Sequence, residues 1–278
     1  MNETTKPRVA VLGLGLIGSI WARHLEAAGL LAAAWNRTPM PDFPRFVSTP
    51  REAAERADTV IVVVADPPAV ESVLRAMLPV LTARHLVIQS STIGPSDSTR
   101  FRALVTASGA SYLESPFTGS KPAAEAKKTI FYTGGDPAAA ARAESVQQHI
   151  SAQRIPCGSG EQACTVKLAM NLQIGAQAQA LCEAIALCRA AGVSDDTFFT
   201  CMKGNASWSG LSALKEPKLR AADYQPQFSV KHLLKDLRLL RRDTRDLPAL
   251  AALIRQLEAA EQAGDRDLDF IALYKRIG

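Results

Sequence analysis

The first half of the chain alternates short apolar runs with longer amphipathic segments. The runs are rich in Val, Ile and Ala and have the length of strands, whereas most of the segments between them have the length of helices. The runs cover residues 9–14, 31–35, 59–64, 86–89, 111–114 and 130–133. Helix-start signals agree, because Thr49 and Glu52 form a capping box and Asp136 precedes Pro137. The pattern predicts a doubly wound parallel sheet with helices on both faces.

After residue 158 the strand-like runs disappear and long helical patterns follow. Residues 161–191 contain no proline and a single glycine, Gly175, so they can form one helix about 46 Å long. Such a helix needs a partner surface for its apolar and alanine-rich faces, and we expect a homodimer through it. The sequence thus predicts an α/β domain over residues 1–158 and an all-α domain, built on the long helix, over residues 159–278.

Composition narrows the class of protein. With 278 residues, 47% of them hydrophobic, the chain can bury a sizeable core, which excludes a disordered, collagen-like or disulfide-scaffold protein. The net charge of +5 is spread along the chain, which favours small anionic ligands over nucleic acid. The five cysteines have no metal-ligand spacing, so we expect reduced thiols and no metal site. A polar start and the lack of a long apolar run predict a soluble, cytoplasmic protein without a membrane segment.

A glycine motif follows the first predicted strand. Gly13, Gly15 and Gly18 form the pattern GxGxxG, and residues 19–28 continue as a helix before the second strand. In a strand–helix–strand unit of this length, the first glycine permits a tight turn, the second admits a pyrophosphate to the backbone, and the third brings helix and strand together. The motif predicts a Rossmann-type dinucleotide site formed by the whole loop, with its intervening residues Leu14, Leu16 and Ile17. The alternative is a glycine-rich turn without a ligand.

The end of the second strand indicates which dinucleotide binds. An Asp or Glu is expected there when the ribose 2′-hydroxyl is recognised, but this chain has Asn36, Arg37 and Thr38. Arg37 can pair with a 2′-phosphate, and the two neighbours can add hydrogen bonds. We therefore expect NADPH rather than NADH, although Arg37 could also be an ordinary exposed loop residue.

Five stretches together resemble the β-hydroxyacid dehydrogenase family, which includes 3-hydroxyisobutyrate dehydrogenase, tartronate semialdehyde reductase and the glyoxylate/succinic semialdehyde reductases. The resemblance covers nearly the whole chain. The stretches are residues 13–18 with 36–38, residues 91–92, residues 114–122 (ESPFTGSKP), residues 158–160 with 167–171 (GSG and KLAMN), and residues 228–236 (FSVKHLLKD). The third and fifth look most like the glyoxylate/succinic semialdehyde reductase branch.

Lys167 and Asn171 are four residues apart on the predicted long helix, so their side chains share one face. The resemblance implies that Lys167 is the general acid/base. An ammonium group can stabilise a carbonyl oxygen and protonate it, and Asn171 can orient both groups without neutralising the charge. Without the surrounding stretches the pair would read as a surface lysine and a helical asparagine.

The remaining site residues follow from the resemblance. The segment 115–121 breaks a strand and is expected to be a loop at the carboxyl edge of the sheet. Thr118, Gly119 and Ser120 would hold the substrate carboxylate there, with Thr118 in place of the serine usual in the family. Further substrate or cofactor contacts are implied at other positions: Phe228 and Asp236 beside the substrate, and Val64, Ala65, Thr92 and Lys235 beside the cofactor. His232 and Trp208 receive no assigned role.

These features predict an NADPH-dependent reductase of a small aldehyde acid such as glyoxylate or succinic semialdehyde. The alternative hypotheses are a dehydrogenase of the 3-hydroxyisobutyrate or tartronate semialdehyde type, an imine reductase, and a non-catalytic NADP-binding protein. The presence of Lys167 argues against the imine reductases, which commonly replace this lysine.

Overall fold

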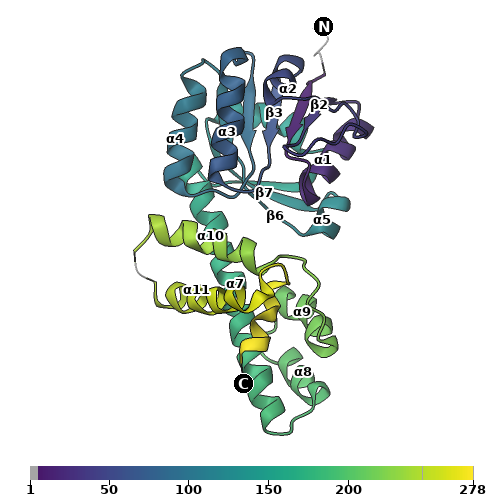
Figure 1. Cartoon of the computed structure of the whole chain (residues 1–278), viewed down its shortest axis with the longest axis vertical. Helices are drawn as coiled ribbons and strands as arrows, with labels where there is room; N and C mark the ends of the chain where they lie inside the picture. The colour runs from purple at the N-terminus through teal and green to yellow at the C-terminus, as the bar shows by residue number, and fades with distance from the viewer. Residues whose placement is uncertain (1–5, 246, 278) are drawn as a thin grey trace. The chain divides into compact units, whose positions relative to one another are not determined.

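The computed structural model describes residues 6–245 and 247–277 and shows two compact units, Met1–Lys167 and Leu168–Gly278 (Figure 1). The division falls inside the long helix α7 (Gly160–Ala190), which begins in the first unit and continues in the second. The sequence places its domain boundary at residue 158, just before this helix begins, because the sequence pattern changes there.

The first unit contains an eight-stranded sheet in the order β2-β1-β3-β4-β5-β7-β6, with β8 beside β7. Its strands are β1 (Val9–Leu12), β2 (Leu31–Trp35), β3 (Thr59–Val62), β4 (Leu86–Gln89), β5 (Ser111–Glu114), β6 (Phe117–Thr118), β7 (Thr129–Gly135) and β8 (Ser151–Pro156). The first five strands pair in parallel, which agrees with the predicted class. Their carboxyl ends therefore meet at one edge, where ligands bind in such sheets.

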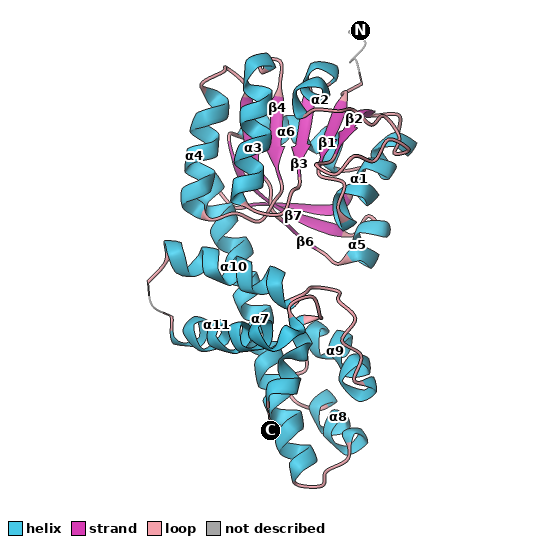
Figure 2. Cartoon of the chain, in the orientation of Figure 1, coloured by secondary structure: helices cyan, strands magenta, loops and turns pink. Residues whose placement is uncertain are grey.

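Helices cover both faces of this sheet (Figure 2). They are α1 (Leu16–Ala27), α2 (Pro50–Arg56), α3 (Pro67–Met77), α4 (Pro95–Thr106), α5 (Lys121–Glu125) and α6 (Pro137–Gln147), with a short 3-10 turn at Leu78–Val80. Alternate residues of β1 face opposite ways. Ala10 and Leu12 pack with residues of α2, α3 and α4, whereas Val9 and Val11 pack with residues of α1 and α6. Strand β1 is apolar at every position because both faces of the sheet are buried.

The helix-start signal at Asp136 is confirmed, and the capping box at Thr49 is confirmed in part. Thr49 Oγ1 accepts the backbone N–H of Glu52 at 3.1 Å. The Glu52 carboxylate accepts the N–H of Ser48 rather than that of Thr49, so the reciprocal half of the capping box is shifted by one residue. Asp136 caps α6 through the N–H of Ala138 at 2.9 Å. These bonds satisfy N–H groups that have no partner within the helix.

The far edge of the sheet differs from the parallel pattern. Strand β7 runs antiparallel to both β5 and β6. The segment 115–121, expected to be a loop, contains the short strand β6, and α5 begins at its last residue. Phe117 anchors β6 because its ring packs on Trp21 of α1 at 4.8 Å between centroids. Strand β8 is absent from the sequence-based list because most of its residues are exposed or half-buried, so it lacks an apolar run.

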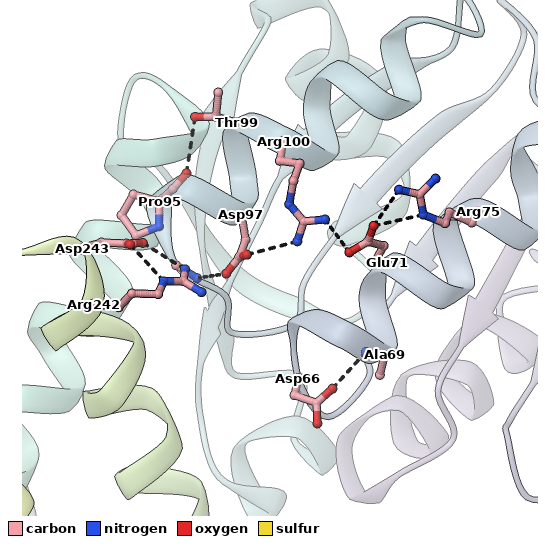
Figure 3. A network of polar contacts seen from close by, with 11 residues as sticks. Asp66, Ala69, Glu71, Arg75, Pro95, Asp97, Thr99, Arg100, Arg242 and Asp243 are labelled. Atoms are coloured by element: carbon pink, nitrogen blue, oxygen red, sulfur yellow. Dashed lines mark hydrogen bonds and ion pairs between the residues drawn. The ribbon is translucent and has the colours of Figure 1, made fainter.

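Ion pairs join α3 and α4 on the surface of the first unit (Figure 3). Glu71 of α3 accepts hydrogen bonds from Arg75 on its own helix and from Arg100 of α4. The two guanidinium groups lower the pKa of the Glu71 carboxyl. Arg100 also contacts Asp97, whose other oxygen accepts the N–H of Gly94 at 3.3 Å. These contacts set the position of α4 beside α3 and cap its first turn.

The second unit is helical throughout, as predicted. Besides most of α7 it contains α8 (Asp195–Lys203), α9 (Gly210–Ala221), α10 (Val230–Asp243), α11 (Pro248–Ala260), a π-helical turn (Glu261–Asp265) and a 3-10 helix (Phe270–Arg276). The 31 residues of α7 confirm the single long helix. Gly175 allows close packing, because a Cβ there would lie 2.5 Å from Leu253 of α11. Over the described ranges, we find no helix with both the length and the apolar character required to cross a membrane.

Candidate functional site

The glycine motif forms a tight turn between β1 and α1. Gly13 has φ +108°, a conformation that side chains disfavour, and a Cβ there would lie 2.2 Å from the carbonyl oxygen of Val63. At Gly18 a Cβ would lie 1.9 Å from the carbonyl oxygen of Gly13. Both positions therefore need glycine because of contacts within the protein itself.

Gly15 is different. Its φ is −69°, which any residue can adopt, and among the described residues no atom lies within 4 Å of a Cβ placed there. Helix α1 begins directly after Gly15 and has no acidic residue in its first turn. The first N–H groups of a helix have no partner within the helix and attract anions. The loop thus offers backbone donors and open space at the point where a pyrophosphate would approach, so these residues fit a dinucleotide.

The segment after β2 is tied to this loop. Asn36 Oδ1 accepts the N–H of Leu14 at 3.1 Å, and Asn36 Nδ2 donates to the carbonyl oxygen of Thr38 at 3.0 Å. Arg37 and Thr38 are exposed. Arg37 forms no ion pair with a residue of the described ranges. Asn36 therefore holds the glycine loop in place, while Arg37 is the residue of this segment that is available to an anion.

The carboxyl ends of β3 and β4 are joined by side-chain bonds that the sequence does not indicate. Ser91 Oγ accepts the N–H of Val64 at 2.8 Å. The Gln89 side chain in turn holds Ser91, since its Oε1 accepts the Ser91 N–H at 2.7 Å and its Nε2 donates to the Ser91 carbonyl at 2.9 Å. Thr92 follows and is half-buried. Val64 and Thr92, both expected at the cofactor, thus lie in neighbouring segments of fixed geometry; Ala65 follows Val64 and is exposed.

The expected carboxylate segment lies beyond β5. Thr118 ends β6, Gly119 has φ +139°, and Ser120 is the N-cap residue of α5. Burial raises the pKa of Tyr132 on the neighbouring strand β7, and a hydrogen bond with Thr118 opposes that shift. Tyr132 was not among the predicted site residues, because the sequence places it inside a strand with no polar motif around it. It contacts the hydroxyl that we expect to bind substrate.

Glu114, the last residue of β5, is a second site-adjacent residue that the sequence-based list omits. Its side chain is fully buried and accepts hydrogen bonds from Gln89, Ser98 and Tyr112. Desolvation raises the pKa of Glu114 to about 7, although these donors favour the charged form. The sequence feature that indicates Glu114 is an acidic residue at the end of a predicted strand, directly before the expected carboxylate loop.

In the second unit, Asn171 and Asp236 form a buried polar pair. They are 1% and 3% exposed, and Asn171 Nδ2 donates to Asp236 Oδ2 at 2.7 Å. Lys235 Nζ lies 2.9 Å from Asp236 Oδ1, so this ammonium group is paired within its own helix. Lys167 lies one helical turn before Asn171 on α7 and is half-buried. The second unit therefore brings together Asn171, Lys235 and Asp236, three of the predicted residues.

Phe228 is held by its backbone and its ring. Its N–H donates to Asp269 at 3.3 Å, and its ring packs edge-on against Phe270 at 5.9 Å between centroids. Asp269 is fully buried and also accepts from Lys215 Nζ at 2.7 Å. The buried ion pair thus fixes the segment that carries Phe228. His232 hydrogen-bonds Ser229 at 2.8 Å, which is a local packing contact.

Two family models together match residues 8–277. The model of the NAD binding domain of 6-phosphogluconate dehydrogenase matches residues 8–165. The model of the NAD-binding region of NADP-dependent 3-hydroxyisobutyrate dehydrogenase matches residues 158–277. The chain belongs to the β-hydroxyacid dehydrogenase family. It is an NAD(P)-dependent hydroxyacid dehydrogenase or reductase, and the resemblance found in the sequence is confirmed.

Individual proteins are similar to this dehydrogenase over most of its length. An uncharacterized oxidoreductase of Synechocystis sp. is 31% identical over 246 residues, which cover 84% of each chain. Glyoxylate/succinic semialdehyde reductase 1 of Arabidopsis thaliana is 26% identical over 97% of this chain and 98% of its own. The structure of Mycobacterium tuberculosis 3-hydroxyisobutyrate dehydrogenase with L-serine superposes with a TM-score of 0.90 over 98% of this chain and 99% of its own, at 24% identity. This last likeness shows the fold.

Proposed function

We propose that this dehydrogenase reduces a small aldehyde acid, of the glyoxylate or succinic semialdehyde class, to the hydroxy acid with NADPH. The observation that carries the proposal is the buried bond between Asn171 and Asp236, one helical turn after Lys167. A carboxylate accepts hydrogen bonds and does not donate them. Asp236 therefore determines that Asn171 presents Nδ2 to it and keeps Oδ1 as an acceptor for another group.

The proposed roles follow from this orientation. NADPH, when bound, supplies a hydride from C4 of its nicotinamide to the aldehyde carbon. Asn171 Oδ1 accepts a hydrogen bond from the Lys167 ammonium group and aims the remaining protons of Lys167 at the aldehyde oxygen. Lys167 donates a proton to that oxygen as its negative charge develops, and the positive charge stabilises it beforehand. The family resemblance further assigns Lys235 to the cofactor and Phe228 to the substrate.

The substrate carboxylate is assigned to Thr118, Gly119 and Ser120. Gly119, with φ +139°, turns the backbone between β6 and α5, so that the N–H groups around it can converge on an anion. Thr118 adds a hydroxyl whose position is supported by Tyr132. The extra methyl group of threonine narrows the space beside the carboxylate, which favours short substrates.

The preference for NADPH is assigned to Arg37. It is exposed at the carboxyl end of β2, and the segment 36–38 contains no carboxylate to repel a 2′-phosphate. A guanidinium group can bind such a phosphate through two parallel hydrogen bonds. The comparisons support a nicotinamide dinucleotide, and the choice of NADPH rests on this residue.

A steady-state assay of NADPH oxidation over a panel of short semialdehydes tests the proposal. We expect Lys167→Ala to lower kcat at least about 1,000-fold while NADPH affinity stays within about twofold, since proton transfer and charge stabilisation each contribute 100-fold or more. The exposed Lys203→Ala is the matched control and should keep full activity. Joint loss of turnover and NADPH binding in Lys167→Ala would argue against the assigned role. Turnover of cyclic imines but of no aldehyde acid would refute the substrate class.

We also propose a homodimer through α7. Ala180, Ala184 and Leu187 follow helical i, i+4, i+7 spacing, and Leu187 is 72% exposed. Together these side chains form an apolar stripe on α7 that a second copy of the helix would cover. Sedimentation at micromolar concentration should give a dimer for the natural chain and a monomer for Leu187→Glu. A monomeric natural chain would refute the assignment.

A further inference from the structure

The carboxyl ends of β3, β4 and β5 are linked by one continuous chain of hydrogen bonds that starts at the buried Glu114. We propose that Glu114 is a positioning residue: by holding Gln89, it fixes the Ser91–Thr92 segment and Val64 in the arrangement that hydride transfer requires. The inference rests on the proposed function, because it concerns the same reaction. It assigns roles to Glu114 and Gln89, neither of which is among the site residues predicted from the sequence.

The first link is the Glu114 carboxylate. Gln89 Nε2 donates to Oε1 at 2.7 Å, while Ser98 Oγ and Tyr112 Oη both donate to Oε2 at 2.8 Å. The Cys164 thiol of α7 also hydrogen-bonds this carboxylate. Glu114 is 0% exposed, so water does not compete for these bonds. The donors come from β4, α4, β5 and α7, and one side chain therefore joins four elements of the first unit.

The second link is the orientation of the Gln89 amide. Its Oε1 accepts the Ser91 N–H and its Nε2 donates to the Ser91 carbonyl, so both ends of the amide hydrogen-bond the backbone of one residue. Rotating the amide by 180° would set donor against donor and acceptor against acceptor at Ser91. Glu114 Oε1 is an acceptor, so it stabilises only the amide orientation in which Gln89 Nε2 faces it and both bonds to Ser91 form.

The third link passes from Ser91 to β3. Ser91 Oγ accepts the N–H of Val64, the second residue beyond the end of that strand. Thr92, next in the chain, is a predicted contact of cofactor and substrate. A shift of Gln89 would therefore move Val64 and Thr92 together, although neither touches Glu114.

The packing around Glu114 leaves little room for such a shift to be absorbed elsewhere. At Gly160, the first residue of α7, a Cβ would lie 2.7 Å from Ser98 Oγ and 3.2 Å from Glu114 Cβ. The start of helix α7 therefore packs closely against the Glu114 and Ser98 side chains, and Lys167 lies further along the same helix. Misplacement of reacting groups by about 1 Å can lower a rate about 100-fold.

Two substitutions separate the acceptor role from the charge. Glu114→Leu replaces the carboxylate with an apolar side chain of similar size. The Gln89 amide then loses the acceptor for its Nε2 group. Glu114→Gln removes the charge but can keep its Oε1 toward Gln89, since the hydroxyls of Ser98 and Tyr112 can rotate to accept from its amide group. His85→Leu is the matched control, because His85 is equally buried, at 0% exposure, at the amino end of β4.

We expect Glu114→Leu to lower kcat about 10- to 100-fold with NADPH affinity within about threefold, because the glycine loop is untouched. The amide protons of Val64 and Ser91 should exchange at least about tenfold faster than in the natural protein. Glu114→Gln should restore both properties to within about threefold, and His85→Leu should alter neither. If Glu114→Leu does not fold, Gln89→Met breaks the next link and should give the same kcat and exchange changes.

Equal losses of kcat in Glu114→Leu and His85→Leu, or unchanged exchange at Val64 and Ser91, would overturn the positioning role. The exchange measurement needs no substrate. A natural protein that turns over no aldehyde acid would therefore refute the proposed function, while the exchange result would still decide whether Glu114 positions these strand ends.

Discussion

The three motif glycines allow a test that separates folding from cofactor binding. Gly13→Ala and Gly15→Ala add the same methyl group two residues apart. At Gly13 it meets the Val63 carbonyl at 2.2 Å and forces alanine to adopt φ +108°. At Gly15 it meets no described atom within 4 Å, and φ is −69°. The first change should therefore damage the protein, and the second should damage only the ligand site.

The magnitudes follow from these distances. A left-handed backbone costs alanine about 1 to 2 kcal/mol, and relief of the collision with Val63 costs about 1 to 3 kcal/mol more. The free energy of unfolding of Gly13→Ala should fall by about 2 to 5 kcal/mol, which lowers Tm by roughly 5 to 20 °C. Gly15→Ala should be as stable as the natural protein or about 0.4 to 1 kcal/mol more stable, because alanine restricts the unfolded chain.

The binding effect is the reverse. A methyl group at Gly15 occupies the space through which a pyrophosphate approaches the backbone. An overpacking cost of about 1 to 3 kcal/mol corresponds to an affinity loss of about 5- to 150-fold. Thermal unfolding followed by circular dichroism, without cofactor, measures the first quantity, and titration of NADPH fluorescence measures the second. If Gly15→Ala binds NADPH like the natural protein, or loses as much stability as Gly13→Ala, the assignment of the loop fails.

Three further predictions concern single charged groups. Arg37→Ala should weaken NADPH about 10- to 100-fold and leave NADH unchanged, since a hydrogen bond between charged groups contributes about 1.5 to 3 kcal/mol; equal effects on both cofactors in a binding titration would contradict this. Because the folded-state pKa of Glu114 is raised to about 7 from 4.5, its contribution to stability is full below pH 4.5 and is lost as the pH rises through 7, by about 3 kcal/mol. The urea midpoint should change less between pH 5 and pH 8 in Glu114→Gln than in the natural protein. Equal changes in the two proteins would refute this prediction. Lys215→Met should cost about 3 to 5 kcal/mol by leaving Asp269 buried without its ammonium partner, and Asp269→Asn in the same chain should recover part of that loss in urea unfolding; no recovery would show that the pair is not coupled.

Some of the site is local in the sequence and could be predicted from it. The strands 31–35, 86–89 and 111–114 match the structure residue for residue, because mostly apolar runs of that length bounded by turns have few alternatives. The glycine loop is also local, since its three glycines, the preceding strand and the following helix are contiguous. The same holds for α7, where the lack of proline over 161–191 permits one long helix.

The antiparallel strand β7 and the edge strand β8 could not be predicted in the same way. Whether β7 runs parallel or antiparallel depends on its partners β5 and β6, which are chosen by packing across the sheet and leave no mark in the run itself. The bond between Asn171 and Asp236 joins residues 65 positions apart, on α7 and α10. No spacing rule connects such positions.

The sequence by itself determined the kind of chemistry, because glycines, a lysine and an asparagine at fixed local spacings carry it. Only the tertiary structure decided how those groups are held. Glu114, Gln89 and Tyr132 owe their importance to burial beside other strands, and a buried acceptor acts on the donors that the fold places around it. Hydrogen bonds between elements depend on distance in space, which the order of residues along the chain does not specify.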